Sequence, residues 1–454
     1  MAAVPLCWCA QSVRVTCPNG TDLTVSIVGR PGRSIAGMPL ALHTLMRLQM
    51  QVGEVMRELS QGLPGAIKVV TAFGGVSINP QISQLEANGF QIKNQFSVLQ
   101  DAVSQQLTGM VQGSQHSAEQ LRAVEDKAIT EIVKFQQDVG LKSITDGEFR
   151  RTYFHIDFLE QLGGVVTDIP LSVLQPDGTT HLAPPVMRVT DKVVHARNIE
   201  VENFKYLATQ VAAGCTPKMT IPSPTMLHFR GGRAGISREA YPELDPAFYD
   251  DVAQAYGDEL RSLYAAGCRY VQMDDTNLAY LCDEKMREAA RQRGDDPNEL
   301  PHRYAAFINK VVAHKPAGMT LAMHLCRGNF KSTHAAAGNY EPVAEALLSK
   351  MDLDAYFLEY DDDRSGDFRP LRFLPKGKIV VLGLVTTKFG EMETKDMLKR
   401  RIEEAARYAP LEQLALSPQC GFSSTVHGNN IAVEVQRNKL RLVIETAQEV
   451  WGNH

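Results

Sequence analysis

The sequence predicts an α/β protein built on a (β/α)8 TIM barrel with an atypical N-terminal extension. From Ser117 onward, short apolar segments alternate with helical segments, which is typical of a parallel sheet. Polar and metal-binding side chains follow several of these apolar segments, where TIM barrels carry their active sites. A chain of 454 residues is long enough for such a barrel and an additional segment.

Candidate strands follow one another along the second part of the chain. They lie near Ile144 and at Met219–Ile221, Tyr270–Met273, Thr320–Met323, Ala355–Leu358, Ile379–Leu382 and Gln413–Leu416. Helices are expected between them. A first helix starts at a capping box formed by Ser117 and Gln120 and ends at Gly140, and others cover Pro246–Ala266, Pro301–His314, Thr394–Tyr408 and Asn430–Trp451.

Residues 1–116 differ from the rest in composition, because charged residues are sparse and Gln and Ser are frequent. Two alternating segments around Asn19-Gly20 predict a β-hairpin. A barrel with the strands above needs one more strand before Ser117, and Ile67–Phe73 is the candidate. The expected organisation is an N-terminal segment, 1–116, that supplies this strand or is partly disordered, followed by the barrel, 117–454.

Composition excludes several classes of partner. The net charge of −5 is spread without long runs of one sign, so no nucleic-acid partner is expected. No segment reaches the roughly 18–20 apolar residues that span a bilayer, and Met1–Ala10 lacks the basic region of a secretion signal. Eight cysteines in a long chain predict reduced thiols and a cytoplasmic protein. The sequence indicates no particular oligomeric state.

A metal site is predicted at the strand ends. His324 and Cys326 are two residues apart on one strand, so their side chains point the same way. Glu359 ends the next strand and Cys420 follows the last one, which completes a His/Cys/Glu/Cys set for a tetrahedral zinc ion. One of the acidic residues Asp361–Asp363 is an alternative to Glu359.

This ligand set favours chemistry on a thiol. Thiols have a pKa of about 8.5, and zinc coordination deprotonates them. Two anionic cysteine ligands and an acid keep a bound substrate thiolate rich in electrons, whereas hydrolytic zinc sites favour histidine. The sequence therefore predicts alkylation of a thiol.

Four segments resemble the cobalamin-independent methionine synthase family, specifically the short bacterial-type proteins that match its catalytic C-terminal barrel. They are Ile144–Arg151, Thr220–Leu227, Met323–Asn329 and Leu416–Phe422, and the resemblance runs from about Ser117 to Gly452. The family transfers a methyl group from 5-methyltetrahydrofolate to homocysteine, so the resemblance implies these small-molecule substrates and methionine as the product.

The resemblance also implies roles for individual residues. Zinc ligands of the family fall on His324, Cys326, Glu359 and Cys420. The carboxylates that hold the homocysteine amine fall on Glu148 and Asp274, which agrees with the need of an ammonium group for anionic partners. Asp275 is equally consistent with a structural role. Ser223 and Thr225 fall in a loop on the pterin side and are candidate substrate-binding residues.

Three departures from the family pattern stand out. Full-length members carry an extra N-terminal barrel, and the family barrel opens with a His-Val-Gly-Ser-like strand; residues 1–116 contain neither. Lys388 stands where the family has a catalytic histidine, so it becomes the catalytic candidate. A lysine there places positive charge beside the pterin or the substrate carboxylate, but it is a poor proton donor at its usual pKa of about 10.4.

Three functions remain open. The first is zinc-dependent methyl transfer from a methyltetrahydrofolate, polyglutamylated, to homocysteine. The second is zinc-dependent alkylation of another thiol, such as coenzyme M opening an epoxide. The third is a catalytically silent barrel with a binding role. Glu148 and Asp274 favour an amino-acid thiol.

Overall fold

The computed structural model describes residues 120–167, 186–329, 332–423 and 429–452 in full. It also describes the backbone of short strands at 9–16, 22–29, 34–35, 38–39, 76–78, 172–174 and 180–182. The chain forms two compact units. One comprises Met1–Lys127 and Asp168–Val186, and the other comprises Ala128–Thr167 and Met187–His454. The second unit carries every predicted site residue.

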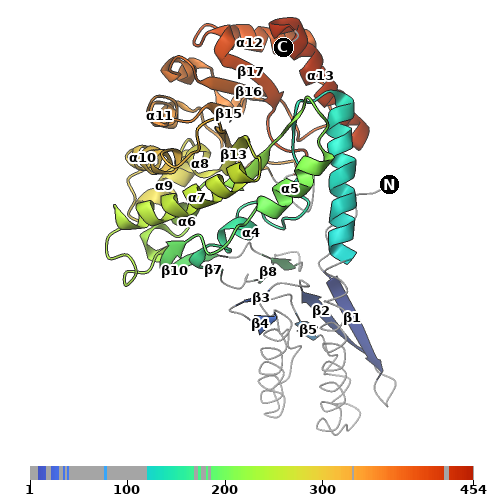
Figure 1. Ribbon diagram of the computed structural model, residues 1–454, viewed down its shortest axis with the longest axis vertical. Helices are drawn as coiled ribbons and strands as arrows, with labels where there is room; N and C mark the ends of the chain where they lie inside the picture. The colour runs from blue at the N-terminus through green and yellow to red at the C-terminus, as the bar shows by residue number, and fades with distance from the viewer. Residues whose placement is uncertain are drawn as a thin grey trace. The chain divides into compact units, whose positions relative to one another are not determined.

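The larger unit is built on a parallel sheet whose strands lie side by side in chain order (Figure 1). The six strands are β12 (Met219–Pro222), β13 (Tyr270–Asp275), β14 (Thr320–Leu325), β15 (Ala355–Glu359), β16 (Ile379–Val385) and β17 (Leu414–Pro418). Asp274 lies opposite His324 across β13 and β14. Because all the strands run in the same direction, their carboxyl ends meet at one edge of the sheet.

A further parallel strand extends the sheet next to β12. β6 (Ser143–Ile144) pairs with β11 (Thr216–Pro217), and only Lys218 separates β11 from β12. All the predicted strands from Ile144 onward are therefore confirmed, in the predicted order. Within the described residues no strand joins β17 to β6, so a closed barrel is not seen. The candidate first strand, Ile67–Phe73, lies outside the described residues.

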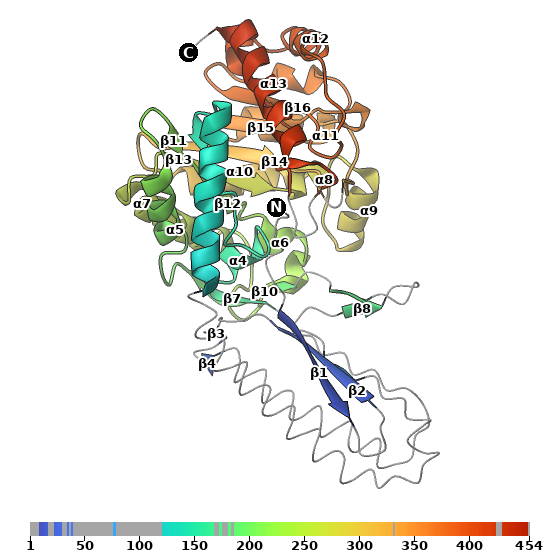
Figure 2. The same cartoon turned by 90° about the vertical axis from the view of Figure 1, so that its right-hand side faces the viewer.

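Helices alternate with the strands and cover the outer face of the sheet (Figures 1 and 2). The longer ones are a helix over residues 120–139, α5 (Val201–Gln210), α7 (Ala247–Ala265), α9 (Glu284–Gln292), α10 (Leu300–Val312), α12 (Lys395–Ala405) and α13 (Val433–Trp451). The predicted helices are confirmed where they are described, with ends that differ by a few residues, while the predicted capping box at Ser117 begins outside the described residues. Gly140 ends the first of them with φ of 99°, a conformation that glycine adopts without strain.

Short elements connect the main ones. They are the helices α4 (Ile156–Leu159), α6 (Met226–Phe229), α8 (Asn277–Tyr280) and α11 (Glu341–Ala344), which a π-helix, Glu345–Lys350, continues. β7 (Gly163–Thr167) and β10 (Met187–Val194) form an antiparallel pair.

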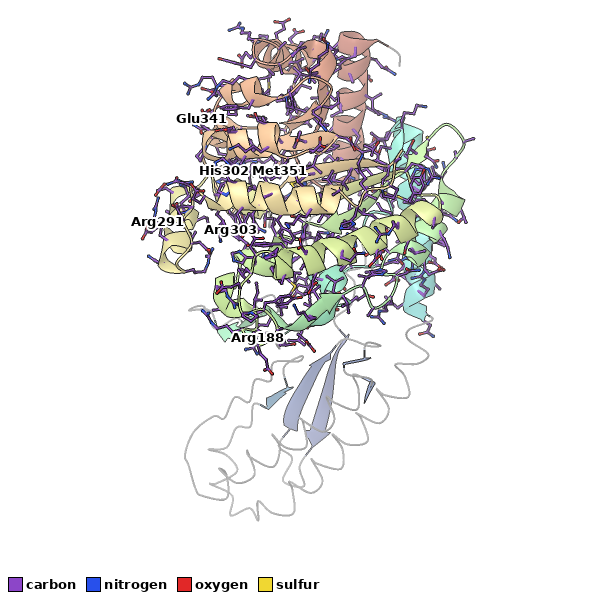
Figure 3. All side chains as sticks on the ribbon, turned by 60° about the vertical axis from the view of Figure 1, so that its left-hand side comes forward. Arg188, Arg291, His302, Arg303, Glu341 and Met351 are labelled. Carbon is purple, nitrogen blue, oxygen red and sulfur yellow. The ribbon has the colours of Figure 1, made fainter. Side chains whose placement is uncertain are left out.

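The core lies between the sheet and the helices. Alternate residues of the strands, such as Val271 and Met273 of β13, are fully buried among helix side chains. The hydroxyl of Tyr256, on α7, donates to the carbonyl of Pro222 at 2.9 Å and ties that helix to the end of β12. On the solvent side the helices expose charged side chains such as Arg291 and Arg303 (Figure 3).

The first and last of the longer helices of this unit pack on each other. The Arg437 guanidinium of α13 lies 4.5 Å from the centroid of the Phe135 ring in the helix over residues 120–139. Ile444 of α13 lies next to Gly140. The helix layer therefore returns to its starting point around the sheet.

In the smaller unit, the predicted hairpin is confirmed in its strands. β1 (Cys9–Thr16) and β2 (Asp22–Gly29) pair antiparallel, with Val13 opposite Val25, and β5 (Val76–Ile78) adds to β2. Two short antiparallel pairs complete the description: β3 (Ser34–Ile35) with β4 (Met38–Pro39), and β8 (Ser172–Leu174) with β9 (Thr180–Leu182). Among the described residues of the chain, no helix combines the length and the apolar character needed to cross a membrane.

Candidate metal centre and active site

Three strands bring the predicted metal ligands together. His324 lies near the end of β14 and Cys326 directly after it, Glu359 is the last residue of β15, and Cys420 follows β17. The ligand atoms of His324, Glu359 and Cys420 lie within 4.8 Å of one another. The Cys326 and Cys420 Sγ atoms are 3.6 Å apart. The structure thus groups His324, Glu359 and Cys420 within reach of one ion and places the Cys326 thiol beside Cys420.

These distances fit a zinc ion. Two sulfur atoms bound at about 2.3 Å to a tetrahedral ion lie roughly 3.8 Å apart, close to the spacing of the two thiols. The His324 Nε2 atom lies 3.7 Å from Glu359 Oε1, which suits a nitrogen and an oxygen that share an ion. Glu359 is 1 % exposed, and a buried carboxylate between thiols and an imidazole suits a cation better than water.

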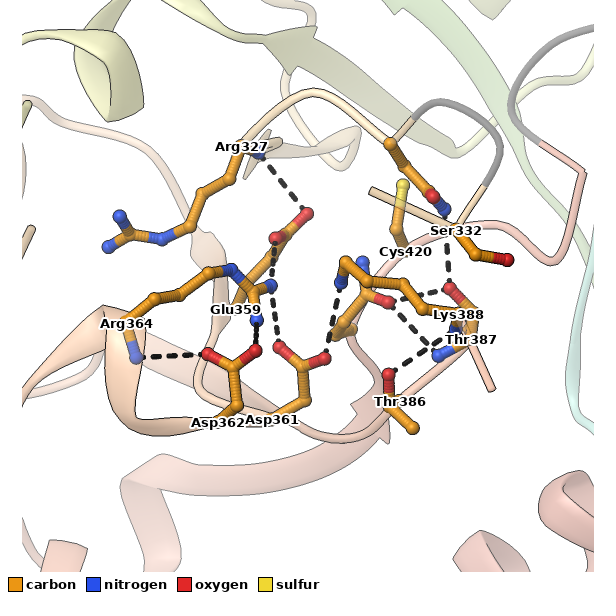
Figure 4. A network of polar contacts seen from close by, with 12 residues as sticks. Arg327, Ser332, Glu359, Asp361, Asp362, Arg364, Thr386, Thr387, Lys388 and Cys420 are labelled. Carbon is orange, nitrogen blue, oxygen red and sulfur yellow. Dashed lines mark hydrogen bonds and ion pairs between the residues drawn. The ribbon is translucent and has the colours of Figure 1, made fainter. Parts of the chain in front are cut away.

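An arginine holds the acidic loop after β15 (Figure 4). The Arg364 guanidinium pairs with Glu359 Oε2 at 2.9 Å, with Asp361 Oδ1 at 2.7 Å and with Asp362. Asp361 also pairs with the Lys388 ammonium at 3.2 Å. Glu359 Oε1 lies 3.7 Å from His324 Nε2 while its Oε2 pairs with Arg364, so Glu359 is the carboxylate grouped with the imidazole and the Cys420 thiol, rather than the alternatives in Asp361–Asp363.

The electrostatics of the metal-free site match this arrangement. Burial by itself would raise the pKa of Glu359, but His324, Lys388 and Arg364 outweigh it and lower the pKa to about 2. Burial would lower the pKa of His324, but hydrogen bonds to Asp274 and Glu359 raise it well above its usual range. The charged imidazole lies between the carboxylates of Asp274 and Glu359.

Glu148 follows β6 and is held in place by an unusual turn of the backbone. Its φ is 57°, in the left-handed region that non-glycine residues rarely adopt, and its N–H donates to Asp146 Oδ1 at 2.9 Å. The Thr220 hydroxyl donates to its carboxylate at 2.9 Å, and the buried Arg151 lies 3.5 Å away. Burial, and then the charges of Asp274 and Asp146 against that of Arg151, raise the pKa of Glu148 to about 6.

Asp274 connects this region to the metal ligands. Its Oδ1 atom lies 3.5 Å from His324 Nδ1 and accepts a hydrogen bond from Gln272 Nε2 at 2.6 Å. Because the Asp274 charge raises the pKa of Glu148, the two carboxylates are close enough to interact. The predicted amine-binding residues thus lie together beside His324.

The remaining predicted residues lie deeper. Ser223 and Thr225 are fully buried, 3.0 Å apart between their hydroxyl oxygens. The Thr225 hydroxyl donates to Asp275 Oδ2 at 2.6 Å, and Asp275 Oδ1 accepts from the Leu278 N–H at 2.8 Å. Asp275 therefore fixes the loop after β12 to α8. The substrate contacts of Ser223 and Thr225 stay predictions.

Lys388 lies after β16 and is 2 % exposed. Its ammonium pairs with Asp361, and its charge acts on Glu359. The residue thus lies beside the metal ligands, and its catalytic role stays a prediction. Arg364 went unpredicted. Its only signal in the sequence is its position after three consecutive aspartates, which need a cation when they are buried.

Comparison with known proteins assigns the family. Residues 99–449 match the family model for the catalytic domain of cobalamin-independent synthase. The uncharacterized protein YxjH of Bacillus subtilis is 47 % identical over 336 residues, which are 74 % of this chain and 88 % of that protein. The chain belongs to the cobalamin-independent methionine synthase family. Members of this family are methyltransferases, and the chain shares their α/β catalytic fold.

Two further relatives place the chain within the cobalamin-independent methionine synthase family. A crystal structure from Listeria monocytogenes, provisionally named a vitamin-B12-independent methionine synthase, is 38 % identical with a TM-score of 0.57, covering 73 % of this chain and 88 % of that one. The 5-methyltetrahydropteroyltriglutamate–homocysteine methyltransferase of Bacillus licheniformis is 23 % identical over 336 residues, which are 74 % of this chain but 39 % of that protein.

Proposed function

We propose that this protein transfers the methyl group of 5-methyltetrahydrofolate, in its polyglutamylated form, to the sulfur of homocysteine, and that it uses a zinc ion to do so. The observation that carries the proposal is the convergence of His324, Glu359 and Cys420 within 4.8 Å, with the Cys326 thiol beside Cys420. Membership of a methyltransferase family supports the reaction type.

The donor set suits thiol chemistry. A zinc ion held there would keep a coordinated substrate thiol deprotonated at neutral pH. The two cysteines and Glu359 bring negative charge to the site, while Arg364 binds the outer oxygen of Glu359 and fixes its orientation. Glu359 is buried, which strengthens its electrostatic interactions, while both thiols are partly exposed and so open to a substrate.

Glu148 and Asp274 support an amino-acid substrate. The charge of Asp274 raises the pKa of Glu148, so the two carboxylates form a site for a cation, and the ammonium of homocysteine is a cation. Coenzyme M carries a sulfonate in place of the ammonium group, and the same carboxylates would repel it. The pair therefore favours homocysteine over that alternative.

The methyl donor binds across the mouth from the metal ligands, against the loop after β12. In this proposal Lys388, held by Asp361, supplies a fixed positive charge close to the reacting groups. Ser223 and Thr225 shape the loop against which the pterin lies, since they are locked to Asp275.

We further propose that the sheet closes into a (β/α)8 barrel, with the first strand supplied by residues 1–116 and the barrel proper formed by 117–454. Packing of Arg437 on Phe135 supports closure, because it joins the last helix of the layer to the first. Hydrogen exchange tests this. Backbone amides of β6 and β17 should be protected along both edges, whereas fast exchange along one edge of each would contradict closure. Separately, we propose that the protein is cytoplasmic.

Methionine formation is the direct test. Zinc-loaded protein should convert homocysteine and methyltetrahydrofolate to methionine, with the polyglutamylated donor preferred over the monoglutamate. Coenzyme M with an epoxide is the matched alternative reaction. If the protein binds zinc but converts neither homocysteine nor coenzyme M, it is a catalytically silent barrel with a binding role. If it binds no zinc, both zinc-dependent reactions are excluded.

A further inference from the structure

A lysine lies inside the sheet, below the metal ligands. Lys218 lies between β11 and β12, and its Nζ atom is 4.7 Å from the ring centroid of Phe357 and 5.1 Å from that of Tyr270. Burial lowers its pKa to about 8, against the opposing charges of Asp274 and Glu148, so the ammonium is the main form at neutral pH. A charge in such surroundings costs free energy unless it is hydrogen-bonded.

Its hydrogen bond begins a chain that ends at a metal ligand. Lys218 Nζ donates to Gln272 Oε1 at 2.7 Å, and Gln272 Nε2 donates to Asp274 Oδ1 at 2.6 Å. The same Asp274 oxygen lies 3.5 Å from His324 Nδ1. Gln272 and Asp274 are two residues apart on β13, so their side chains share one face of that strand, and Val271 and Met273 occupy the other face in the apolar core.

The chain of hydrogen bonds has a direction. An ammonium group can only donate, so the Gln272 amide must present its oxygen to Lys218 and its NH2 group to Asp274. Asp274 then accepts on the side of Gln272 and remains an acceptor for the Nδ1–H of His324. A histidine that carries its proton on Nδ1 binds a metal through Nε2, the atom that faces Glu359.

We propose that Lys218 is a positioning residue for the metal centre, which acts through Gln272 to hold Asp274 as the acceptor of the His324 Nδ1–H and so directs Nε2 at the ion. The inference rests on the proposed function in one respect, since it takes the ion to be zinc. It adds to that function two residues, Lys218 and Gln272, with defined donor and acceptor roles.

A purely structural role is the competing explanation, because Lys218 also packs between two aromatic rings. The variant Gln272→Glu distinguishes the structural role from the positioning role. The new carboxylate still pairs with Lys218, but it lies against the Asp274 carboxylate instead of donating an N–H to it, so a moderate loss of stability is expected. The matched control is Lys315→Met, since Lys315 bonds Asp354 at 3.0 Å and the Met319 carbonyl at 2.8 Å, both at the opposite end of the strands.

The experiment measures zinc affinity against a competing chelator and the melting temperature of the metal-free protein. Gln272→Glu should lower the melting temperature no more than Lys218→Met does and should raise the zinc Kd on the order of tenfold, as the loss of partners of metal-bound histidines does. Lys218→Met should also raise the Kd, and Lys315→Met should not.

Two results would overturn the proposal. In the first, both Gln272→Glu and Lys218→Met bind zinc as tightly as the unaltered protein, whatever their melting temperatures. In the second, Lys315→Met weakens zinc binding as much as Lys218→Met does. Failure of the proposed function has a different signature, because the unaltered protein would then bind no zinc.

Discussion

The Sγ atoms of Cys326 and Cys420 lie 3.6 Å apart, although they follow strands that are not neighbours in the sheet. β14 and β17 are three positions apart, and in a flat sheet that separation is about 14 Å. Contact between the two thiols therefore requires strong curvature of the sheet. The same curvature that a barrel needs is what assembles the metal ligands.

Zinc content should depend on both of these thiols. Cys326→Ser and Cys420→Ser should each lower the bound zinc from about one ion per chain to a small fraction, because a serine hydroxyl is a far weaker ligand than a thiolate. Metal analysis of freshly purified protein checks this. Cys215→Ser is the control, since Cys215 bonds the Leu141 carbonyl away from the site. Equal zinc in all three variants would rule out the ligand set.

Homocysteine use should depend on the ionisation of Glu148. Its pKa is raised to about 6, so the carboxylate is protonated below that pH and loses its attraction for an ammonium group. We expect kcat/KM for homocysteine to rise as the pH increases through about 6, and the step to vanish in Glu148→Gln. A pH profile of kcat/KM reports groups of the unbound enzyme and is the measurement to make. An unchanged step in the variant would assign it to another group.

Lys388 should act through its charge. Lys388→Met leaves Asp361 paired only with Arg364, and we expect a loss of stability of about 3 kcal/mol or less and a fall in kcat of at least about tenfold. Lys388→Arg keeps the charge and should retain more activity than Lys388→Met. Steady-state kinetics and thermal unfolding of both variants test this, and equal losses of kcat in the two would argue against a role for the charge.

Two adjacent aspartates should behave differently. Asp275→Ala removes the acceptor of Thr225 and of the Leu278 N–H in a fully buried network, so it should cost about 3 kcal/mol of stability. Asp274→Ala should cost less stability but raise KM for homocysteine by at least about tenfold, and it should also weaken zinc binding, since Asp274 accepts from Gln272 and lies beside His324. Unfolding curves and kinetics of the two variants distinguish the roles, and a reversed pattern would exchange them.

Periodicity predicted most of the fold. The strand ends near Ile144, Leu358 and Leu382 and the helices between them were all accessible from local pattern, because buried parallel strands are short apolar segments. His324 and Cys326 were predictable because two residues on one strand share a face. Predicting Cys420 as a ligand required, in addition, only the order of the strands in the sheet.

Other features depend on contacts that no local pattern contains. The choice of Glu359 over Asp361 follows from which carboxylate reaches His324, and Arg364 pairs with both only after the loop folds back on β15. Pairing of Lys388 with Asp361 joins two loops that follow different strands. The direction of the Gln272 amide follows from Lys218, a residue on another strand.

The left-handed backbone at Glu148 shows that stability and activity oppose each other at this position. A non-glycine residue at φ 57° costs the folded state on the order of 1 kcal/mol, and asparagine or glycine would relieve part of that cost. Glu148→Gly should therefore fold at least as well as the unaltered chain and yet lose its hold on the amino acid. Selection for thermostable variants would therefore favour that substitution and yield inactive protein.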